Sequence, residues 1–431
     1  MDLSPAAAGP NALIWNTTSG TWNTSATNWL VSGSGSPVAY TQGDSVTFSG
    51  TGGGIVTISG SMQPSSITVS ATSGTYTFVS SAGNLLTGTT GLAKSGGGTL
   101  ILSGSSAFSG STAITGGTIR AGADGALGTG TLSLAGGTIA SADSTARTFT
   151  NGVTVGGDVT VGDGTGTGAV TFSGATNLGG ATRAITTVAD TTFSGVISNG
   201  GLTKLGPGTL VLTAANTYAG ATTVSAGKLL VNGQITSATT SVAALATLGG
   251  SGTIAGAVVV GASGTLSPGT SPGILTVNSL SLSGSAVTLM EIVGSGTTAG
   301  VAGTGYDQVS ILSSGGLAFG GILDLDFGNR ATSFARGTTF QLFAFSGSTS
   351  GDFTTLRILD LSGAYAGLSF SQSPYVSGEW TTGIIPATGG NYLVFSENAG
   401  TLAVVPEPSA IALAALGAGM VGWRVTRRRP R

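Results

Sequence analysis

The stretch of sequence that decides the fold occurs twice, as GLAKSGGGTLILSGSSAFSGSTAITGGTIRAG at Gly91–Gly122 and as GLTKLGPGTLVLTAANTYAGATTVSAGKLLVN at Gly201–Asn232. Each copy contains a glycine-rich turn around a lysine, a Thr-Leu-x-Leu strand, a turn with an aromatic residue, and further short strands. A unit this thin cannot bury its apolar face alone, whereas stacked units share a continuous core. The repeat therefore predicts a solenoid with threonines outside and leucines inside. These leucines are Leu100, Leu102, Leu210 and Leu212.

The same alternation of apolar residues with threonine or serine continues outside the two copies. It occurs at 45–48, 55–58, 67–69 and 75–79, and a period of two is typical of half-buried strands. The 431 residues include 77 glycines, which interrupt the chain too often for a helical bundle or an α/β core. We therefore expect an all-β protein. Whether residues 234–300 continue the same coil is left open.

The composition excludes several classes of chemistry. Histidine and cysteine are absent, which excludes Ser-His-Asp and Cys-His catalysis, disulfides, and metal or haem sites that need imidazole or thiolate. We expect no cofactor and no metal. The chain before Arg424 has nine basic and 16 acidic residues, a net charge of −7. Because binding to phosphates needs clustered Lys and Arg, we expect no nucleic-acid partner.

The repeated unit G-L-x-K-x-G-x-G-T-L-x-L…[FY]-x-G-x-T…G resembles the autotransporter-associated β-strand repeat, which occurs in passenger domains of secreted bacterial surface proteins. Weaker similarity, including Tyr306-Asp307 after a Ser-Pro-Gly segment, extends over most of residues 11–370. The resemblance implies a right-handed parallel β-helix and an exported protein.

A different pattern closes the chain: Val405-Pro406-Glu407-Pro408-Ser409, an apolar run, and an arginine cluster. Two prolines around a carboxylate favour an extended, accessible stretch. The run Ala410–Trp423 gives a short helix of roughly 21 Å against a hydrocarbon core of ~30 Å, so we expect a weak, temporary membrane anchor. Its apolar residues include Ile411, Leu413, Leu416, Met420, Val421 and Trp423. The arginines that we expect on the cytoplasmic side are Arg424, Arg427, Arg428, Arg429 and Arg431.

Together these features resemble the PEP-CTERM sorting signal, and the alternative is a plain C-terminal tail anchor. The resemblance implies processing by exosortase, a transpeptidase-like membrane enzyme of Gram-negative bacteria that make exopolysaccharide. It also implies that Pro406, Glu407 and Pro408 form the processing motif, with Glu407 as the recognised side chain. The protein would be anchored transiently in the inner membrane and then reach the cell surface or the medium.

These patterns divide the chain into five parts. The expected parts are 1–10 (a signal-peptide remnant or a flexible N-terminus), 11–90 (an N-terminal β region or cap), 91–235 (a solenoid with both repeats), 236–403 (a passenger-like β region) and 404–431 (the sorting segment).

Few side chains are candidates for catalysis or metal binding. Alternation places Asp324 and Asp326 on one face of a strand, which we interpret as a solvated face rather than a catalytic pair. Asp158 and Asp163 lie among glycines, as in turns. The segment 302–309 resembles one copy of a calcium-binding nonapeptide, but such sites form between successive copies, so we expect a turn before a strand.

Three tryptophans near the start, Trp15, Trp22 and Trp29, lie in turn-rich sequence. We expect them to pack in an N-terminal cap; the alternative is that exposed indoles stack on sugars. Taken together, the sequence predicts a non-enzymatic, exported structural or adhesive solenoid that contacts exopolysaccharide. The alternatives are a carbohydrate-active enzyme on the same fold and a self-assembling surface filament.

Overall fold

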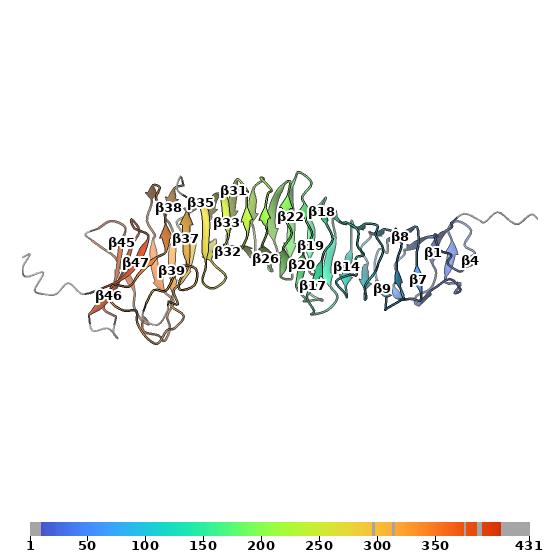
Figure 1. Ribbon diagram of the computed structural model, residues 1–431, viewed down its shortest axis with the longest axis horizontal. Coiled ribbons are helices and arrows are strands. Elements are labelled where there is room, and N and C mark those ends of the chain that lie inside the picture. Colours follow the sequence, from blue (N-terminus) through green and yellow to red (C-terminus); the bar gives the residue numbers. More distant parts are fainter. Residues whose placement is uncertain (1–9, 295–297, 313–314, 375, 386–389, 407–431) are drawn as a thin grey trace, which may run out of the picture.

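The computed structural model describes residues 10–294, 298–312, 315–374, 376–385 and 390–406, which form an elongated rod (Figure 1). All 47 elements in this part of the chain are β-strands, and most pair in parallel with strands of the preceding and following coils. The expected all-β parallel solenoid is confirmed. Its right-handed sense stays a prediction, and the expected C-terminal helix lies outside the described residues.

Three long sheets run along the rod, and successive coils add strands to them. The first sheet consists of β1 (Ala12–Trp15), β5 (Ser45–Phe48), β8 (Ser66–Val69), β11 (Leu92–Lys94), β13 (Thr112–Ile114), β15 (Leu132–Leu134), β18 (Val153–Val155), β21 (Thr176–Asn177) and β24 (Ile197–Ser198), with antiparallel β3 (Trp29–Val31) and β4 (Pro37–Val38). Another sheet consists of β17 (Arg147–Phe149), β20 (Val170–Phe172), β23 (Thr191–Phe193), β26 (Thr209–Leu212), β29 (Lys228–Val231), β32 (Thr247–Gly250), β34 (Thr265–Pro268), β36 (Val287–Glu291), β39 (Ile322–Asp326) and β43 (Thr355–Ile358).

The longest sheet extends over almost the whole rod. Its strands are β2 (Gly20–Trp22), β6 (Gly54–Ile58), β9 (Thr75–Val79), β12 (Thr99–Leu102), β14 (Thr118–Ala121), β16 (Thr138–Ser141), β19 (Val159–Val161), β22 (Thr182–Thr187), β25 (Gly201–Leu205), β27 (Ala215–Asn216), β28 (Thr222–Val224), β30 (Gln234–Ile235), β31 (Thr239–Val242), β33 (Thr253–Val260), β35 (Ile274–Leu282), β37 (Gln308–Ile311), β38 (Leu317–Ala318), β41 (Phe343–Ala344) and β42 (Thr349–Ser350). A short separate pair is formed by β7 (Ser61–Met62) and β10 (Leu85–Leu86).

Apolar side chains of successive coils stack because the parallel strands pair in register. Leu100 of β12 pairs with Tyr76 of β9 on one side and with Ile119 of β14 on the other, and all three are buried. Neighbouring strands lie about 4.8 Å apart, so stacked side chains of this size touch. All four leucines of the Thr-Leu-x-Leu strands are buried, as predicted.

The prediction that threonines point outward is correct for only some of them. Thr99, Thr118 and Thr138 pair along the outside of the rod and are partly exposed. A second set is inside: Thr90, Thr112, Thr176, Thr187, Thr191, Thr222, Thr240 and Thr288 are buried. Some of these hydroxyls have a partner inside the rod, as in Thr112, whose Oγ1 donates to the Leu127 carbonyl at 2.9 Å, whereas those of Thr176, Thr240 and Thr288 have none.

The three N-terminal tryptophans pack inside the first coils. Trp22 and Trp29 are fully buried and Trp15 is 5% exposed. The ring centroids of Trp15 and Trp29 lie 4.9 Å apart and those of Trp22 and Trp29 lie 5.3 Å apart, both edge-to-face. The expectation of cap packing is confirmed. The alternative of sugar stacking is wrong for these residues because no indole face is free.

The coil continues through residues 234–294, within the segment that the sequence left open. β33 pairs with β30 at its beginning and with β31 at its end, and β35 pairs similarly with β37 and β38. Each of these long strands therefore bends around a corner of the rod and joins two of its faces. A register shift between Ile254 and Ala257 marks the bend in β33.

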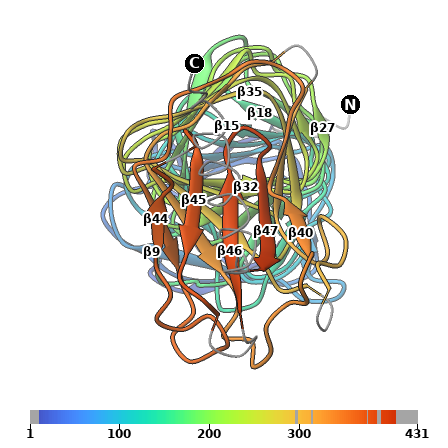
Figure 2. The same ribbon diagram turned by 90° about the vertical axis from the view of Figure 1, so that its left-hand side faces the viewer.

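A five-stranded antiparallel sheet covers the C-terminal end of the rod (Figure 2). Its order is β40 (Thr339–Gln341), β47 (Thr401–Pro406), β46 (Asn391–Ser396), β45 (Glu379–Thr382) and β44 (Phe370–Gln372). Phe395 of this sheet lies 6.4 Å from Phe343 and 6.1 Å from Phe353, measured between ring centroids. The sheet, called the C-terminal cap below, covers apolar side chains of the last coils, as solenoid ends require.

Replacing Phe172 by alanine tests the stacked core. Phe172 is fully buried and stacks on Phe193 at a centroid distance of 4.8 Å. The change leaves a cavity and should lower the free energy of unfolding by about 3–5 kcal/mol. The cost would be measured from denaturant unfolding and from hydrogen exchange in β17, β20 and β23. The control Thr171→Ala, on the outer side of the same strand, should change stability by at most about 0.5 kcal/mol. Equal losses of stability in the Phe172→Ala and Thr171→Ala variants would contradict a core that is stacked through Phe172.

Candidate functional site

The pair Asp324 and Asp326 does not face a common cleft. Both Oδ atoms of Asp324 accept hydrogen bonds of 2.6 Å from Arg357, which pairs with Asp324 on the next coil. Asp324 is only 5% exposed, so the expected solvated face is wrong at this position: the arginine side chain covers the carboxylate. Asp326 accepts from the Gly328 backbone N–H at 2.8 Å. The two carboxylates therefore serve separate structural contacts.

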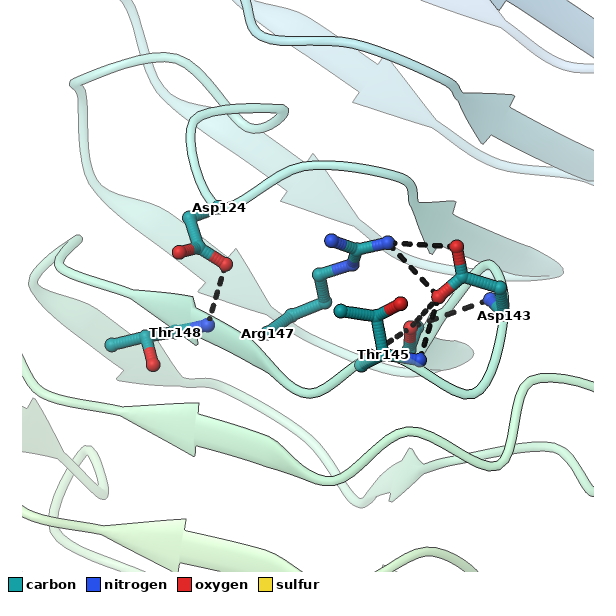
Figure 3. Close-up of polar contacts among 6 residues, drawn as sticks. Asp124, Asp143, Thr145, Arg147 and Thr148 are labelled. Carbon is teal, nitrogen blue, oxygen red and sulfur yellow. Dashed lines mark hydrogen bonds and ion pairs between the residues drawn. The ribbon is translucent and has the colours of Figure 1, made fainter.

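A second polar cluster, which the sequence analysis did not single out, lies in the loop before β17 (Figure 3). Arg147 Nη2 lies 2.9 Å from both carboxylate oxygens of Asp143, and the Thr145 backbone N–H donates to Asp143 Oδ1 at 2.8 Å. The hydrogen bond from the Thr145 backbone is the largest cause that lowers the pKa of Asp143, and the positive charge of Arg147 lowers it further. On the neighbouring loop, Asp124 Oδ1 accepts from the Thr148 backbone N–H at 3.0 Å. The contacts of Asp143 stabilise the loop before β17, and the contact of Asp124 connects that loop to the preceding coil.

The two turn aspartates also connect coils. Asp158 Oδ1 accepts from the Ala184 backbone N–H at 2.9 Å. Asp163 accepts from Arg120 Nε at 2.6 Å and from the amides of Thr165 and Gly166. Burial alone would raise the pKa of Asp163, but these hydrogen bonds and the positive charge of Arg120 outweigh it, and the pKa is lowered. The turn interpretation is correct, and Asp163 in addition joins segments 43 residues apart.

The two repeat copies contain a buried lysine at the same position. Lys94 Nζ donates to the carbonyls of Ser95, Gly96 and Gly116 at 2.6, 3.0 and 3.2 Å. The carbonyls belong to two successive coils, so the ammonium group bridges them. Lys94 is 1% exposed.

Lys204 repeats this arrangement in the second copy. Its Nζ donates to the carbonyls of Leu205, Gly206 and Ala226 at 2.9, 2.8 and 3.0 Å, and its side chain is fully buried. Burial lowers the pKa of Lys204 to about 8. Gly227 has φ +65°, and a Cβ at this position would lie 2.9 Å from Nζ, so glycine is needed both for the turn and for the space. The sequence predicts both lysines in turns, and this is wrong: Lys94 ends β11 and Lys204 lies within β25, each just before its turn. Their recurrence in both copies was the available signal.

Among the described residues of the C-terminal half, Asp307 is the most deeply buried carboxylate. Its two oxygens accept from the backbone N–H groups of Gly273 at 2.7 Å and Glu291 at 2.9 Å. Burial, together with the nearby Glu291 carboxylate, raises the pKa of Asp307 to about 7. The predicted strand after the 302–309 turn is present as β37. Since both Asp307 oxygens point to amides of neighbouring segments, the residue holds the turn in place.

Three shallow hollows on the rod surface have volumes of 240, 260 and 350 Å³. Their walls are mostly glycine, alanine, serine and threonine, and their one titratable side chain is Asp190, which accepts from the Thr209 backbone N–H at 3.0 Å. Among the residues that the structure describes, no group of three or more acidic side chains could hold a metal ion. These hollows offer hydroxyl and backbone groups and no acid–base pair.

The predicted sorting residues lie at the end of the C-terminal cap or beyond it. Pro406 is the last residue of β47 and pairs with Asn391. The remaining predicted residues lie outside the described part of the chain: Glu407 and Pro408 of the motif, Ile411, Leu413, Leu416, Met420, Val421 and Trp423 of the anchor, and the arginine cluster from Arg424 to Arg431. Within residues 10–406 as described, no helix is long and apolar enough to span a membrane.

Family models match the chain at both repeats and at its end. Residues 404–429 match the PEP-CTERM protein-sorting motif. Residues 92–121 and 202–231 each match the passenger-associated-transport-repeat. No curated protein matches the chain. Both resemblances seen in the sequence are thus supported, and together the matches point to an exported protein with a sorting signal that an exosortase-type system processes.

Replacing Lys204 by methionine tests the lysine bridge. Methionine fills similar space without donors and leaves three carbonyls unpaired, so we expect a loss of about 1–3 kcal/mol in the free energy of unfolding. The matched control is Lys228→Met on β29, whose side chain is partly exposed and should tolerate the change within about 0.5 kcal/mol. Denaturant midpoints measure both. A Lys204 effect as small as the control would refute the bridge.

The raised pKa of Asp307 predicts a pH dependence of stability. The folded chain binds this proton at a pKa of about 7, above the ordinary aspartate value, so protonation stabilises the fold. The stabilisation of the fold by protonated Asp307 is fully present below about pH 4 and is lost as the pH rises through 7. Unfolding midpoints between pH 5 and 8 should show it, and Asp307→Asn should reduce the dependence whereas Asp158→Asn should not. An unchanged profile in Asp307→Asn would contradict the assignment.

Proposed function

We propose that this protein is a non-enzymatic structural or adhesive rod that a Gram-negative bacterium exports, sorts through its PEP-CTERM motif, and displays at the cell surface or releases. The apolar C-terminal segment anchors it transiently in the inner membrane until an exosortase-type enzyme removes that segment. The outer face of the rod then contacts exopolysaccharide. The observation that carries this proposal is that β47, the last described strand of the capped solenoid, contains the first residues that match the sorting motif.

The use of charged side chains supports a non-enzymatic role. The acidic and basic groups described above bind partners within the fold: Asp143 binds Arg147, Asp163 binds Arg120 and Asp324 binds Arg357. General acid–base catalysis needs titratable groups that converge on one substrate position. What the rod presents outward is instead a series of hydroxyl columns, such as the paired Thr99, suited to weak neutral contacts.

Mass spectrometry of the C-terminus tests the sorting proposal. Protein recovered from the cell surface or the medium should lack the segment from Ala410 to Arg431, whereas the variant Glu407→Gln should retain it and remain with the cells. The body should fold equally well in both, because Glu407 follows the last described strand. Extracellular protein that still ends at Arg431 would contradict the proposal.

A further inference from the structure

The sorting motif and the C-terminal cap overlap in sequence. The motif match begins at residue 404, whereas β47 extends from Thr401 to Pro406. The first three matched residues, Val404, Val405 and Pro406, are therefore part of a strand. No linker separates the folded rod from the motif.

This strand lies inside the cap sheet. β47 has β46 on one side, with Val404 opposite Leu393, Val405 opposite Tyr392 and Pro406 opposite Asn391. On its other side lies β40. The sheet thus holds the backbone up to Val404 on both sides and the last two residues on one side.

Hydrogen bonds and burial fix Val404 in particular. Its N–H donates to the Thr338 carbonyl at 2.9 Å, and its carbonyl accepts from the Gly337 N–H at 2.8 Å. The side chains of Val404 and Leu402 are fully buried. Removing this strand would expose both side chains, leave β40 without its partner in the sheet and leave β46 paired with β45 alone. The cap therefore depends on residues that the sorting motif also contains.

An occupied strand cannot also serve as an extended substrate. Enzymes that bind a peptide as a strand do so through its main-chain N–H and C=O groups and through alternate side chains. At Val404 these groups are already bonded within the cap, and the side chain points into the core. While the cap is folded, the strand up to Val404 therefore cannot bind such an enzyme in this way.

We propose that the motif is divided at Pro406: residues 404–406 are a structural strand that the sorting enzyme does not read, and recognition begins at Glu407. The peptide bond that is cleaved lies on the carboxyl side of Pro406, and the mature rod keeps all of β47. This inference rests on the proposed function, because it concerns the same processing event. It adds which part of the motif specifies the reaction.

A cross-strand disulfide tests the division. The variant Tyr392→Cys with Val405→Cys places two thiols opposite each other on β46 and β47, where paired Cα atoms are about 4.5–5.5 Å apart and can be bridged. The chain has no other cysteine, so the bridge is unambiguous. The control bridge joins Ser371→Cys and Thr381→Cys on β44 and β45, away from the motif. Full-length protein is followed in cells by the ratio of processed to unprocessed chain and by C-terminal mass.

We expect the oxidised Tyr392–Val405 bridge to be processed within two-fold of wild type, with the same C-terminus at or beyond Pro406. The inference would be overturned if the Tyr392–Val405 bridge slowed processing more than two-fold, if reduction reversed this effect, and if the control bridge did not show it. Such a result would mean that β47 must detach from the sheet before processing. A mature C-terminus before Pro406 would also overturn it. If wild type is never processed, the proposed function fails instead.

Single substitutions keep the test independent of disulfide formation. Val405→Thr retains a β-branched side chain at a partly exposed strand position and should leave processing within two-fold of wild type. Glu407→Gln should reduce processing at least ten-fold without changing the thermal stability of the cap. Equal losses of processing in the two variants would show that the enzyme reads the strand as well, and would overturn the division at Pro406.

Discussion

Each coil of this rod can bury its apolar side chains and pair its backbone only against the next coil. The strands are two to nine residues long, far too short to form a core of their own, and parallel in-register pairing is what joins them. Register brings like side chains together: Leu100 lies between Tyr76 and Ile119, and Phe172 lies beside Phe193. The low charge and high glycine content follow from this geometry, because coils in close contact leave little room for bulky or solvated groups at their corners.

The few charged side chains strengthen the same contacts between coils. Lys94 and Lys204 each bond to carbonyls of two coils, and Arg357 covers Asp324 on the strand beside it. Buried ions are tolerated only when fully hydrogen-bonded, and three carbonyls satisfy the three donors of an ammonium group. These charged groups are paired within the fold, and threonine hydroxyl groups such as that of Thr99 lie on the outer side of the coils.

The two ends of the rod need additional strands or side chains to cover their apolar core, since a terminal coil has no neighbouring coil on one side. At the N-terminal end, antiparallel strands and the cluster around Trp22 and Trp29 close the core. At the C-terminal end a separate antiparallel sheet does so, and its strand β47 continues into the matched sorting motif. The sorting motif is thereby connected to the end of the fold, because the last described strand of the cap contains the first three residues of the matched motif.

The sequence by itself determined the all-β class, the stacked repeats, the inward leucines and the sorting motif, because each depends on local alternation or on contiguous residues. The structure decided which polar side chains lie inside. The contact of Lys94 with the Gly116 carbonyl and the pairing of Asp324 with Arg357 depend on which residues meet on adjacent coils. Those partners are about 20 to 35 residues apart at spacings that vary with the length of each coil's turns, so alternation along one strand cannot identify them. Only the stacked register fixes them.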